Sequence, residues 1–446
     1  MRRALLLLLA CFLNGVIAAG QQPDSRVVVL DAPPRSAPAG VRQEAFDIVW
    51  QTVKQTHFDP NYGGLDWDKV RERYAPRVPA LATDQELYKL LREMLGELGQ
   101  SHFTITPPEA VIEEDSLLAP RPGGAGVQVQ IIDSLAVISR VEPGSAAARA
   151  GLRPGFLIQK IDGTSAEEIR ERFQNSARSA AETRIRSSRA ILARIDGRPG
   201  TSVRLVYLDE RDRTREVTLE RELRKGELSE RFGNFPPLYT ELESLRLPDG
   251  IGYIRFNLFV PSLMDKIRDR IRSMSDSRGL IIDLRGNPGG IGGMSAAIAG
   301  LLETKQTSLG TMTLRAGHLN MAVFPQANPF VGPVAILIDG GSASTSEIFA
   351  AGLQELGRAV IVGERSMGAA LPSMFQKLPT GALFQYAHAD FKTPNGVMIE
   401  GRGVIPDLEV KLSRSALLGG RDNQLDAAID EIRKRARPQT KERTIP

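Results

Sequence analysis

The feature that most constrains the fold is a run of five apolar residues at 334–338, followed by small residues and then by a helical pattern. The small-residue segment reads Gly-Ser-Ala-Ser-Thr-Ser-Glu over 341–347. Such a run is typical of a buried strand, and the turn that follows leads directly into a helix. A serine at this junction would lie where main-chain N–H groups stabilise negative charge. A serine that merely caps the helix would produce the same pattern, so both interpretations stay open here.

The same alternation of strands and helices continues through the C-terminal half of the chain. Further strands are expected at 251–256, 280–284 and 359–363, with an amphipathic helix at 263–274. Strands separated by helices favour an α/β domain with parallel pairing. We therefore predict a multi-domain α/β protein whose α/β core spans 225–432. A charged, proline-containing tail is expected to follow at 433–446 and to be disordered.

Composition excludes several classes of function. The chain has 446 residues, more than one simple domain needs, with 42% apolar and 25% charged residues. Its formal net charge is +4, two of these charges are Arg2 and Arg3, and acidic and basic residues are otherwise interspersed. The chain has no basic stripe, so nothing in its charge pattern indicates nucleic acid as a partner. No histidine–carboxylate cluster has metal-ligand spacing, so we expect neither a metal nor another cofactor.

The N-terminus has the features of a secretory signal peptide. Two arginines precede an apolar run at 4–13, and small residues around Ala18 offer a cleavage site, which predicts a signal peptide over 1–20. The run is short for a membrane span, so no stable insertion is expected after cleavage. Cys11, the one cysteine, leaves lipid attachment open, and ordinary cleavage removes every thiol. A flexible linker is predicted at 21–40, and a periplasmic location is expected if the source is bacterial.

An N-terminal helical domain is predicted over 41–120. One helix presents an apolar face that begins at Phe46. A second helix opens with a capping-box pattern at Thr83 and is expected to stop at Gly99. His102 follows this stop directly, in a loop where a side chain could be presented to a cleft. The chain has only four histidines, and a lone histidine is more often structural than catalytic, so both interpretations of His102 stay open from this loop alone.

Residues 121–224 change character and predict a β-rich insert. Its motifs are a glycine turn that enters a strand, a Val-x-Pro-Gly-Ser element and an Ile-Asp-Gly turn, at 124–127, 141–145 and 161–163. This order resembles a PDZ domain, which implies that main-chain N–H groups of one loop bind peptide C-termini. The loop residues are Gly124, Ala125, Gly126 and Val127. Two departures leave a β-rich domain without a peptide groove as the alternative: Phe156 replaces the usual aspartate, and 167–194 is unusually long and helical.

Several motifs in order make a more specific pattern. They are Phe-Asp-Pro, Leu-Asp-Trp-Asp, Asp-Leu-Arg-Gly-Asn-Pro-Gly-Gly, Ser-Ala-Ser-Thr-Ser-Glu, Val-Gly-Glu-Arg-Ser-Met-Gly and Ile-Glu-Gly-Arg-Gly-Val-Ile-Pro-Asp, at 58–60, 65–68, 283–290, 342–347, 362–368 and 399–407. Together with the PDZ-like insert they resemble the C-terminal processing peptidases and, more closely, the core of tricorn protease. The resemblance covers nearly all of the chain after the signal segment. It implies a ClpP/crotonase-like core, serine endopeptidase activity without a cofactor, and polypeptide substrates taken by their C-termini.

Carried over by position, the nucleophile of this family falls on Ser344. The resemblance places the oxyanion donors on the backbone N–H groups of Gly290 and Thr345. Both placements agree with the physics of such a site. A glycine lets the backbone approach a substrate closely, and the residue after the nucleophile begins a helix.

One departure decides which base is expected. The processing peptidases use a lysine as base, and that position here is Ala369, which has no titratable group. The tricorn-like pattern implies His102 as the base instead, with Ser101 as a second serine in its loop and Glu400 as the acid. His102 would take the proton of Ser344 and deliver it to the leaving amine. Glu400 would hold the imidazole either directly or through Ser101.

Less specific interpretations of these residues remain. Glu400 could be a surface acid in a strand turn, and Ser101 could end the preceding helix or face solvent. His388 is a rival base, although its strand context favours a structural role. Asp283 and Glu347 are interpreted as structural acids that bond main-chain N–H groups at a strand end and in a first helical turn.

The predicted function is therefore a secreted serine endopeptidase that acts on unfolded or tail-exposed chains. The alternative is a catalytically inactive homologue that binds peptides through its PDZ-like segment, and the missing lysine motivates this reading. A hydrolase of another ester or amide is a third possibility, because fold does not dictate substrate.

Overall fold

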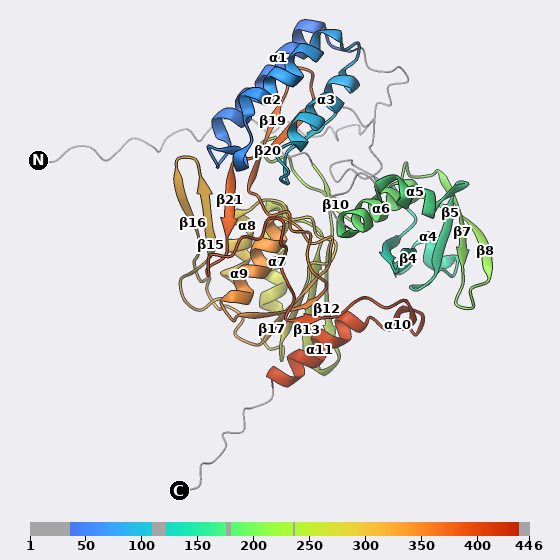
Figure 1. Cartoon of the computed structure of the whole chain (residues 1–446). Helices are drawn as coiled ribbons and strands as arrows, with labels where there is room; N and C mark the ends of the chain where they lie inside the picture. The colour runs from blue at the N-terminus through green and yellow to red at the C-terminus, as the bar shows by residue number, and fades with distance from the viewer. Residues whose placement is uncertain (1–35, 109–121, 175–179, 235–236, 437–446) are drawn as a thin grey trace, which may run out of the picture. The chain divides into compact units, whose positions relative to one another are not determined.

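The computed structural model describes residues 36–108, 122–174, 180–234 and 237–436 (Figure 1). The predicted signal peptide with Cys11, most of the predicted linker, and residues 437–446 of the predicted tail lie outside these ranges. Within them, no helix is both long enough and apolar enough to cross a bilayer.

Three α-helices form most of the described N-terminal part of the chain. They are α1 (Ala39–Thr56), α2 (Trp67–Tyr74) and α3 (Asp84–Gly96). Their apolar faces share one hydrophobic cluster. Within it, the indole N–H of Trp50 donates to the Trp67 carbonyl at 3.0 Å, and the Trp67 indole donates to the Trp50 carbonyl at 3.1 Å. The two large rings are therefore buried with their polar groups satisfied.

The predicted capping box begins α3. The Thr83 hydroxyl accepts the Glu86 N–H at 3.2 Å, and the Glu86 carboxylate accepts the Thr83 N–H at 3.0 Å. The helix ends at Gly96, earlier than the predicted stop at Gly99. Gly99 instead has a positive φ of 64° and turns the chain away from the helix axis.

Strand β1 (Thr104–Thr106) joins this helical part to the rest of the protein. It pairs antiparallel with β20 (Leu383–Ala387). Apolar residues from the hairpin of β19 (Ser373–Lys377) and β20 also enter the cluster of the three helices. The loop 99–103 is consequently fixed between α3 on one side and a strand of the C-terminal half on the other.

The PDZ-like region forms its own antiparallel sheet and core. The strand order is β3-β4-β5-β7-β8, with β6 beside β5. The strands are β3 (Val127–Ile132), β4 (Leu135–Val141), β5 (Leu157–Ile161), β6 (Thr164–Ser165), β7 (Ser202–Leu208) and β8 (Thr214–Glu220). The helices are α4 (Ala146–Arg149), α5 (Ala166–Gln174) and α6 (Ala180–Ile195). Helices α5 and α6 are the long helical stretch that the sequence predicts.

Phe156 shows how this domain departs from the usual PDZ pattern. It is 4% exposed and stacks on Tyr207 with ring centroids 5.6 Å apart. An apolar core contact therefore stands where the pattern usually has an aspartate.

The main sheet of the C-terminal half has the order β12-β13-β14-β17-β18-β22. Its strands are β12 (Leu242–Leu247), β13 (Ile251–Phe256), β14 (Leu280–Asp283), β17 (Val334–Ile338), β18 (Ala359–Gly363) and β22 (Leu408–Glu409). Strand β12 is antiparallel to β13, and every other neighbouring pair is parallel. The predicted parallel α/β core is thus confirmed.

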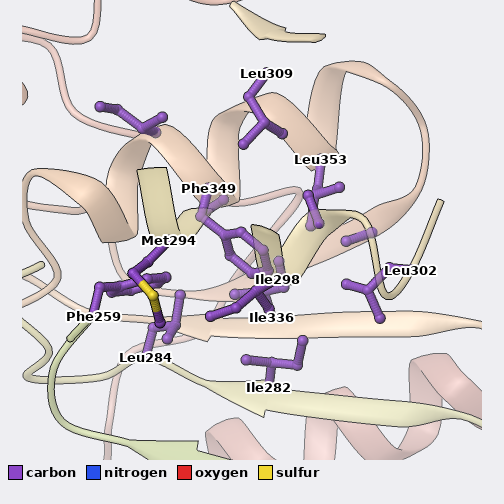
Figure 2. Packing of buried hydrophobic residues seen from close by; sticks show 14 of the residues in the cluster. Phe259, Ile282, Leu284, Met294, Ile298, Leu302, Leu309, Ile336, Phe349 and Leu353 are labelled. Carbon is purple, nitrogen blue, oxygen red and sulfur yellow. The ribbon is translucent and has the colours of Figure 1, made fainter. Parts of the chain in front are cut away.

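Helices cover both faces of this sheet. Residues Ile282 and Ile336 enter a cluster with α7 (Pro261–Ser273), α8 (Gly293–Ala299) and α9 (Thr345–Glu355) (Figure 2). Their neighbours Ile281 and Leu337 enter a second cluster with α11 (Asn423–Arg435). Successive side chains of a strand point to opposite faces of the sheet. Because both faces are buried here, successive positions are apolar, which explains the continuous apolar runs in the sequence. Helix α11 includes residues 433–435, which the sequence analysis assigned to the tail.

Smaller sheets and one short helix complete the described fold. One sheet contains β16 (Gly317–Val323), β15 (Thr307–Leu314) and β21 (Ala389–Lys392), and another contains β1, β20 and β19 (Ser373–Lys377). Two short pairs are β2 (Gly123–Gly124) with β9 (Glu222–Leu223), and β10 (Glu227–Leu228) with β11 (Tyr239–Thr240). Helix α10 (Arg414–Leu418) precedes α11.

The parallel strands end at a common edge of the main sheet, and each is followed by a turn. The turns span 284–290 after β14, 339–344 after β17 and 364–370 after β18. Ligands of open α/β sheets bind at this edge. The candidate site is assembled here.

Candidate active site

Ser344 lies at the junction of β17 and α9. Its backbone has φ 55° and ψ −118°, a conformation that costs a non-glycine residue roughly 1–3 kcal/mol. Surrounding bonds hold the turn, because the Ser344 N–H donates to the Ala369 carbonyl at 2.8 Å and to the Glu347 carboxylate at 3.0 Å. A strained strand-to-helix turn of this kind is the arrangement that exposes a nucleophile at the top of a sheet.

Ser344 is distinguished from the other two serines of its turn by exposure. Ser342 and Ser346 are 0% exposed, whereas Ser344 is partly exposed. The Ser342 hydroxyl donates to the Leu284 carbonyl at 2.7 Å, and the Ser346 hydroxyl donates to the Asn287 carbonyl at 2.9 Å. Both neighbours therefore bind this turn to the glycine-rich turn after β14, and Ser344 alone of the three faces solvent.

Gly290 lies in that glycine-rich turn and forms a parallel bridge with Phe259. The Phe259 N–H donates to the Gly289 carbonyl at 2.9 Å, and the Ile291 N–H donates to the Phe259 carbonyl at 2.7 Å. In such a bridge the N–H and C=O of Gly290 itself point away from Phe259. The Gly290 carbonyl accepts the Thr345 hydroxyl at 2.9 Å, which joins the two turns.

Two main-chain N–H groups of these adjoining turns are unpaired. Among the described residues, neither the Gly290 N–H nor the Thr345 N–H has a hydrogen-bond acceptor. A Cβ added to Gly289 would lie 2.7 Å from the Thr345 nitrogen and 2.9 Å from the Ser344 Cβ, so the two turns are in contact. At Gly290, φ is 141° and a Cβ would lie 2.2 Å from the Phe259 carbonyl oxygen, so only glycine fits there. Unpaired donors in this position are what an oxyanion requires.

Glu347 supports the turn that carries Ser344 from within the core. It is 0% exposed, and burial raises the pKa of its carboxyl to about 7. Besides the Ser344 N–H it accepts the N–H groups of Gly368 and Ala369 at 2.7 and 2.9 Å. The Ser366 hydroxyl donates to it at 2.5 Å. Glu347 has the structural role that its place in the first helical turn predicts.

His102 lies in the loop between α3 and β1, with a positive φ of 62°. The hydroxyl of Ser101 donates to Glu400 Oε2 at 2.8 Å and lies 2.7 Å from His102 Nδ1. A hydroxyl has one proton, and an ionised carboxylate can only accept, so that proton lies in the bond to Glu400. Nδ1 is therefore the protonated ring nitrogen of His102, and Nε2 carries the lone pair that can accept a proton.

Glu400 is held by main-chain donors on both carboxylate oxygens. Oε1 accepts the Ser101 N–H at 2.8 Å, and Oε2 accepts the Ala370 N–H at 3.0 Å as well as the Ser101 hydroxyl. Ser101 is 8% exposed. Ser101 therefore does not face solvent, and Glu400 is not a free surface acid. Of the two routes left open by the sequence, Glu400 reaches the imidazole through Ser101.

Burial lowers the pKa of His102 from its ordinary 6.5 to about 4. The ring is therefore neutral at neutral pH and able to take a proton. Among the described residues, no hydrogen bond joins His102 to Ser344. The structure thus groups His102 with Ser101 and Glu400, and groups Ser344 with the two N–H donors.

Residues 369 and 370 connect these two groups. The Ala369 carbonyl accepts the Ser344 N–H, and the next residue, Ala370, donates its N–H to Glu400. The serine and the glutamate are thus bonded to consecutive residues of one segment. The resemblance to the processing peptidases assigns their lysine to the position of Ala369, whose methyl group offers no base.

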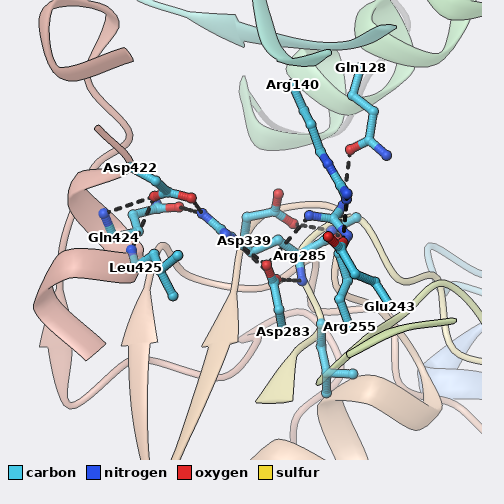
Figure 3. Close-up of polar contacts among 12 residues, drawn as sticks. Gln128, Arg140, Glu243, Arg255, Asp283, Arg285, Asp339, Asp422, Gln424 and Leu425 are labelled. Atoms are coloured by element: carbon cyan, nitrogen blue, oxygen red, sulfur yellow. Dashed lines mark hydrogen bonds and ion pairs between the residues drawn. The ribbon is translucent and has the colours of Figure 1, made fainter. Parts of the chain in front are cut away.

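A buried ion-pair network lies under the glycine-rich turn (Figure 3). Asp283 is 0% exposed and accepts the backbone N–H of Arg285 at 3.0 Å and its guanidinium at 2.7 Å. The same guanidinium reaches Gln424 at 3.0 Å and Asp422 at 2.8 Å, both at the start of α11. Burial opposes ionisation, but Arg285 and Arg255 keep the pKa of Asp283 well below its usual range. This bonding agrees with the structural role predicted for Asp283.

Asp339 was not among the predicted site residues, yet it binds both turns of the site. Its Oδ1 accepts the N–H groups of Gly286 and Gly341, each at 2.8 Å. Its Oδ2 accepts the side-chain amide of Gln130 on β3 at 2.9 Å. The sequence signal was an aspartate placed directly after a buried strand and before two glycines, a pattern in which the carboxylate bonds turn N–H groups.

The predicted peptide-binding loop, 124–127, lies between β2 and the start of β3. The Ala125 carbonyl is bonded inside the domain, where it accepts the Ala147 N–H at 3.0 Å. Further along β3, the Ile131 N–H donates to the Ser188 hydroxyl of α6 at 3.2 Å. One main-chain donor that an added peptide strand could use is therefore occupied by the domain's own helix.

The other three histidines are placed differently. His388 lies between β20 and β21, where its N–H donates to the Pro372 carbonyl at 3.0 Å and burial lowers the pKa of its ring. His318 is exposed on β16, and His57 is buried against the N-terminal helices. In the part of the chain that the structure describes, His102 alone is bonded to a serine–carboxylate pair, and no cluster of His, Cys, Asp and Glu is arranged to hold a metal ion.

Family models match three consecutive regions of the chain. The tricorn protease C1 domain matches 38–96, the PDZ domain matches 116–186 and peptidase family S41 matches 250–410. The chain thus contains a peptidase family S41 domain over 250–410. It is therefore a serine-type peptidase, with an N-terminal helical segment and a PDZ domain ahead of its peptidase core.

Known relatives of this S41 peptidase carry names of processing enzymes. The carboxyl-terminal-processing protease of Synechocystis sp. is 28% identical over 389 residues, which cover 85% of this chain and 84% of the relative. The carboxy-terminal processing protease CtpA of Bacillus subtilis is 24% identical over 330 residues, 74% of this chain and 64% of the relative.

Solved structures show the fold of this S41 peptidase. The photosystem II D1 C-terminal processing protease has a TM-score of 0.55 at 21% identity, covering 84% of this chain and 97% of that one. Tricorn protease has a TM-score of 0.51 at 20% identity, covering 92% of this chain and 38% of that much longer one. Both confirm the predicted arrangement of N-terminal helices, PDZ domain and α/β core.

Proposed function

We propose that this S41 peptidase cleaves polypeptides by acyl-enzyme chemistry, with Ser344 as nucleophile and His102 as base. Ser344 Oγ attacks the carbonyl carbon of the scissile bond while its proton moves to His102 Nε2. That proton then passes to the leaving amine, the C–N bond breaks, and an ester to Ser344 remains. Water, deprotonated by the same imidazole, hydrolyses the ester and restores the serine.

The hydrogen-bonded series His102–Ser101–Glu400 is the observation that carries this proposal. The Nδ1–H group donates to Ser101 Oγ at 2.7 Å, and Ser101 donates to Glu400 at 2.8 Å. The carboxylate charge thus lies two hydrogen bonds from the imidazolium that forms when Ser344 is deprotonated, and it favours that state. Ala369 supplies no competing base.

The N–H groups of Gly290 and Thr345 would receive the oxyanion of the tetrahedral intermediate. Loss of one such donor typically costs about 2.7–4 kcal/mol in the transition state. The Ser366, Gly368 and Ala369 contacts of Glu347 support the proposal, because they fix the backbone that carries Thr345 before substrate binds.

Labelling with a fluorophosphonate probe, followed by peptide mapping, tests the nucleophile. We expect wild type to carry the phosphonate on Ser344, and Ser344→Ala to carry none. Hydrolysis of an unfolded protein such as reduced casein should fall by roughly 10⁴–10⁶ in the same variant. Covalent label on a different serine, or undiminished casein hydrolysis by Ser344→Ala, would refute the assignment.

We further propose that substrates are taken by their C-termini at the loop 124–127, and that the protein acts in the periplasm. The PDZ match, the glycine-rich loop and the names of the relatives support C-terminal capture. The signal-like segment 1–20 supports export. A peptide with a free C-terminus should bind at least several-fold tighter than its amidated form, and equal affinity for the two would contradict capture of the carboxylate.

An inactive peptide-binding homologue is the second candidate, and Ala369 is the observation that favours it. In that case wild type would bind the peptide with the free C-terminus but would neither react with the fluorophosphonate nor hydrolyse casein. The two experiments together therefore separate the candidates.

A further inference from the structure

His57 contacts the loop that carries His102 although it lies outside that loop. It directly follows α1 as the C-cap residue, and it is 0% exposed. Its Nδ1 lies 2.8 Å from the carbonyl oxygen and 3.1 Å from the nitrogen of Asp59, so the main chain supplies a partner for this nitrogen whether or not it carries a proton. Its Nε2 lies 2.9 Å from Gln100 Oε1. A carbonyl oxygen accepts, so Nε2 carries a proton and donates it to Gln100.

The same imidazole ring packs against the other end of this loop. Phe103 stacks on His57 with ring centroids 5.7 Å apart and an interplanar angle of 14°. Phe58 stacks on it at 4.6 Å and 19°, and Tyr62 lies at 5.2 Å. His57 is thus enclosed by aromatic rings and bonded at both nitrogens, so its orientation is fixed.

The two contacts of His57 lie on either side of Ser101 and His102. With Glu400, these two residues form the hydrogen-bonded relay His102–Ser101–Glu400. Gln100 directly precedes Ser101, and Phe103 directly follows His102. Glu400 holds Ser101 itself, through its N–H and its hydroxyl. In the segment 100–103 the side chains of Gln100 and Phe103 thus contact His57, whereas those of Ser101 and His102 bond each other.

The backbone of this loop needs such support. Gly99 and His102 both have positive φ values, 64° and 62°, and the second is unfavourable for a residue with a Cβ. Without fixed neighbours, a loop with such a residue would relax and rotate the imidazole away from Ser101. A displacement of about 1 Å in a catalytic group can cost about 100-fold in rate.

We infer that His57 is a positioning residue of this peptidase, which holds the loop 99–103 through Gln100 and Phe103 and thereby keeps His102 in the Nδ1–H tautomer facing Ser101. The inference rests on the proposed function for its effect on rate, but its effect on the His102 tautomer does not depend on activity. His57 acts through its neighbours and takes no part in proton transfer.

A matched pair of variants at Gln100 tests this without removing the buried ring. Gln100→Leu keeps the approximate size of the side chain but has no acceptor for His57 Nε2–H. Gln100→Glu keeps an acceptor oxygen at the same reach and serves as the conservative rescue. Each purified protein is measured by the second-order rate of fluorophosphonate labelling, by kcat and KM on one peptide, by melting temperature, and by ¹⁵N chemical shifts of the histidine rings.

For Gln100→Leu we expect labelling and kcat to fall by about 10- to 100-fold with little change in KM, and the His102 nitrogen shifts to become an average of two tautomers. For Gln100→Glu we expect rates within about threefold of wild type and the wild-type Nδ1–H shifts. A purely structural role of Gln100 would change the melting temperature without changing the tautomer.

Two results would overturn the inference. The first is that Gln100→Leu labels at the wild-type rate with unchanged His102 shifts. The second is that the labelling rate and kcat of Gln100→Glu fall as far as those of Gln100→Leu, which would mean that the hydrogen bond from His57 to residue 100 does not position His102. If wild type itself fails to label while the His102 tautomer responds to Gln100→Leu as expected, the proposed function fails and the positioning role of His57 stands.

Discussion

Replacing Glu400 by glutamine removes the negative charge of the relay, and the N–H donors around the carboxylate cannot all be satisfied by an amide. Both carboxylate oxygens accept main-chain N–H groups, Oε1 from Ser101 and Oε2 from Ala370. An amide has one oxygen and one NH₂ group, so the NH₂ of Glu400→Gln must face an N–H donor in either orientation. The variant therefore loses the negative charge and also breaks a bond that positions Ser101.

The size of the effect follows from the same geometry. Hydrogen bonds of 2.7 and 2.8 Å that meet at the Ser101 hydroxyl place the carboxylate oxygen roughly 4–5 Å from His102 Nδ1. Two unit charges at this separation interact by about 4 kcal/mol at the effective dielectric constant of a partly buried site. Since about 1.4 kcal/mol corresponds to a factor of ten, the imidazolium should lose enough stabilisation to slow acylation by about 10²–10³-fold.

The assay is the second-order rate of fluorophosphonate labelling, with kcat/KM on a peptide as a second readout. Glu44→Gln is the matched control, because Glu44 is an exposed acid on α1 far along the chain from the relay, and it should label at the wild-type rate. If folded Glu400→Gln labels within about threefold of wild type, Glu400 does not stabilise the charged imidazole and the argument is refuted.

Three further predictions concern the same site. Ser342→Ala and Ser346→Ala should each lower the free energy of unfolding by about 1–3 kcal/mol in urea titrations but keep fluorophosphonate labelling, and loss of labelling in a folded variant would count against the choice of Ser344. Because burial lowers the pKa of His102 to about 4, the neutral base prevails above that pH. The labelling rate should therefore rise through pH 4 and stay level at neutral pH, and a midpoint at the ordinary 6.5 would contradict this. Gly290→Ala should lower labelling by at least about 100-fold, because its Cβ would lie 2.2 Å from a main-chain oxygen. Gly292→Ala is the control and should label at the wild-type rate. Gly292 has φ −54°, and a Cβ added there would have its nearest contact at 3.9 Å, with Met321 Cε.

The strands of the main sheet could be predicted closely because each is a short apolar run with polar or glycine-rich ends. The predicted segments 251–256, 334–338 and 359–363 coincide with β13, β17 and β18. The end of α3 was predicted less well, because the apolar periodicity continues through Leu98, which is buried although it lies outside the helix. The apolar periodicity follows which residues are buried. A turn that packs against the core therefore extends the pattern beyond the end of the helix.

The contacts of the site depend on the fold and could not be derived from spacing. Ser101 and Glu400 are separated by 299 positions, and tertiary contacts such as the β1–β20 pairing and the Ala370–Glu400 bond bring them together. The sequence therefore left open whether Glu400 acts directly or through Ser101. Asp339 and His57 were not identified as supports for the same reason, since their partners Gly286 and Gln100 come from other elements.

The central claim is that His102 is the base that activates Ser344 in a chain without the family lysine. The most direct measurement is the rate of fluorophosphonate labelling of Ser344 in His102→Ala, compared with wild type at neutral pH, with melting temperatures to establish that the variant is folded. We expect a folded variant that labels at least about 10³-fold more slowly than wild type. A folded His102→Ala that labels at the wild-type rate would show that another group takes the proton of Ser344 and would contradict the account.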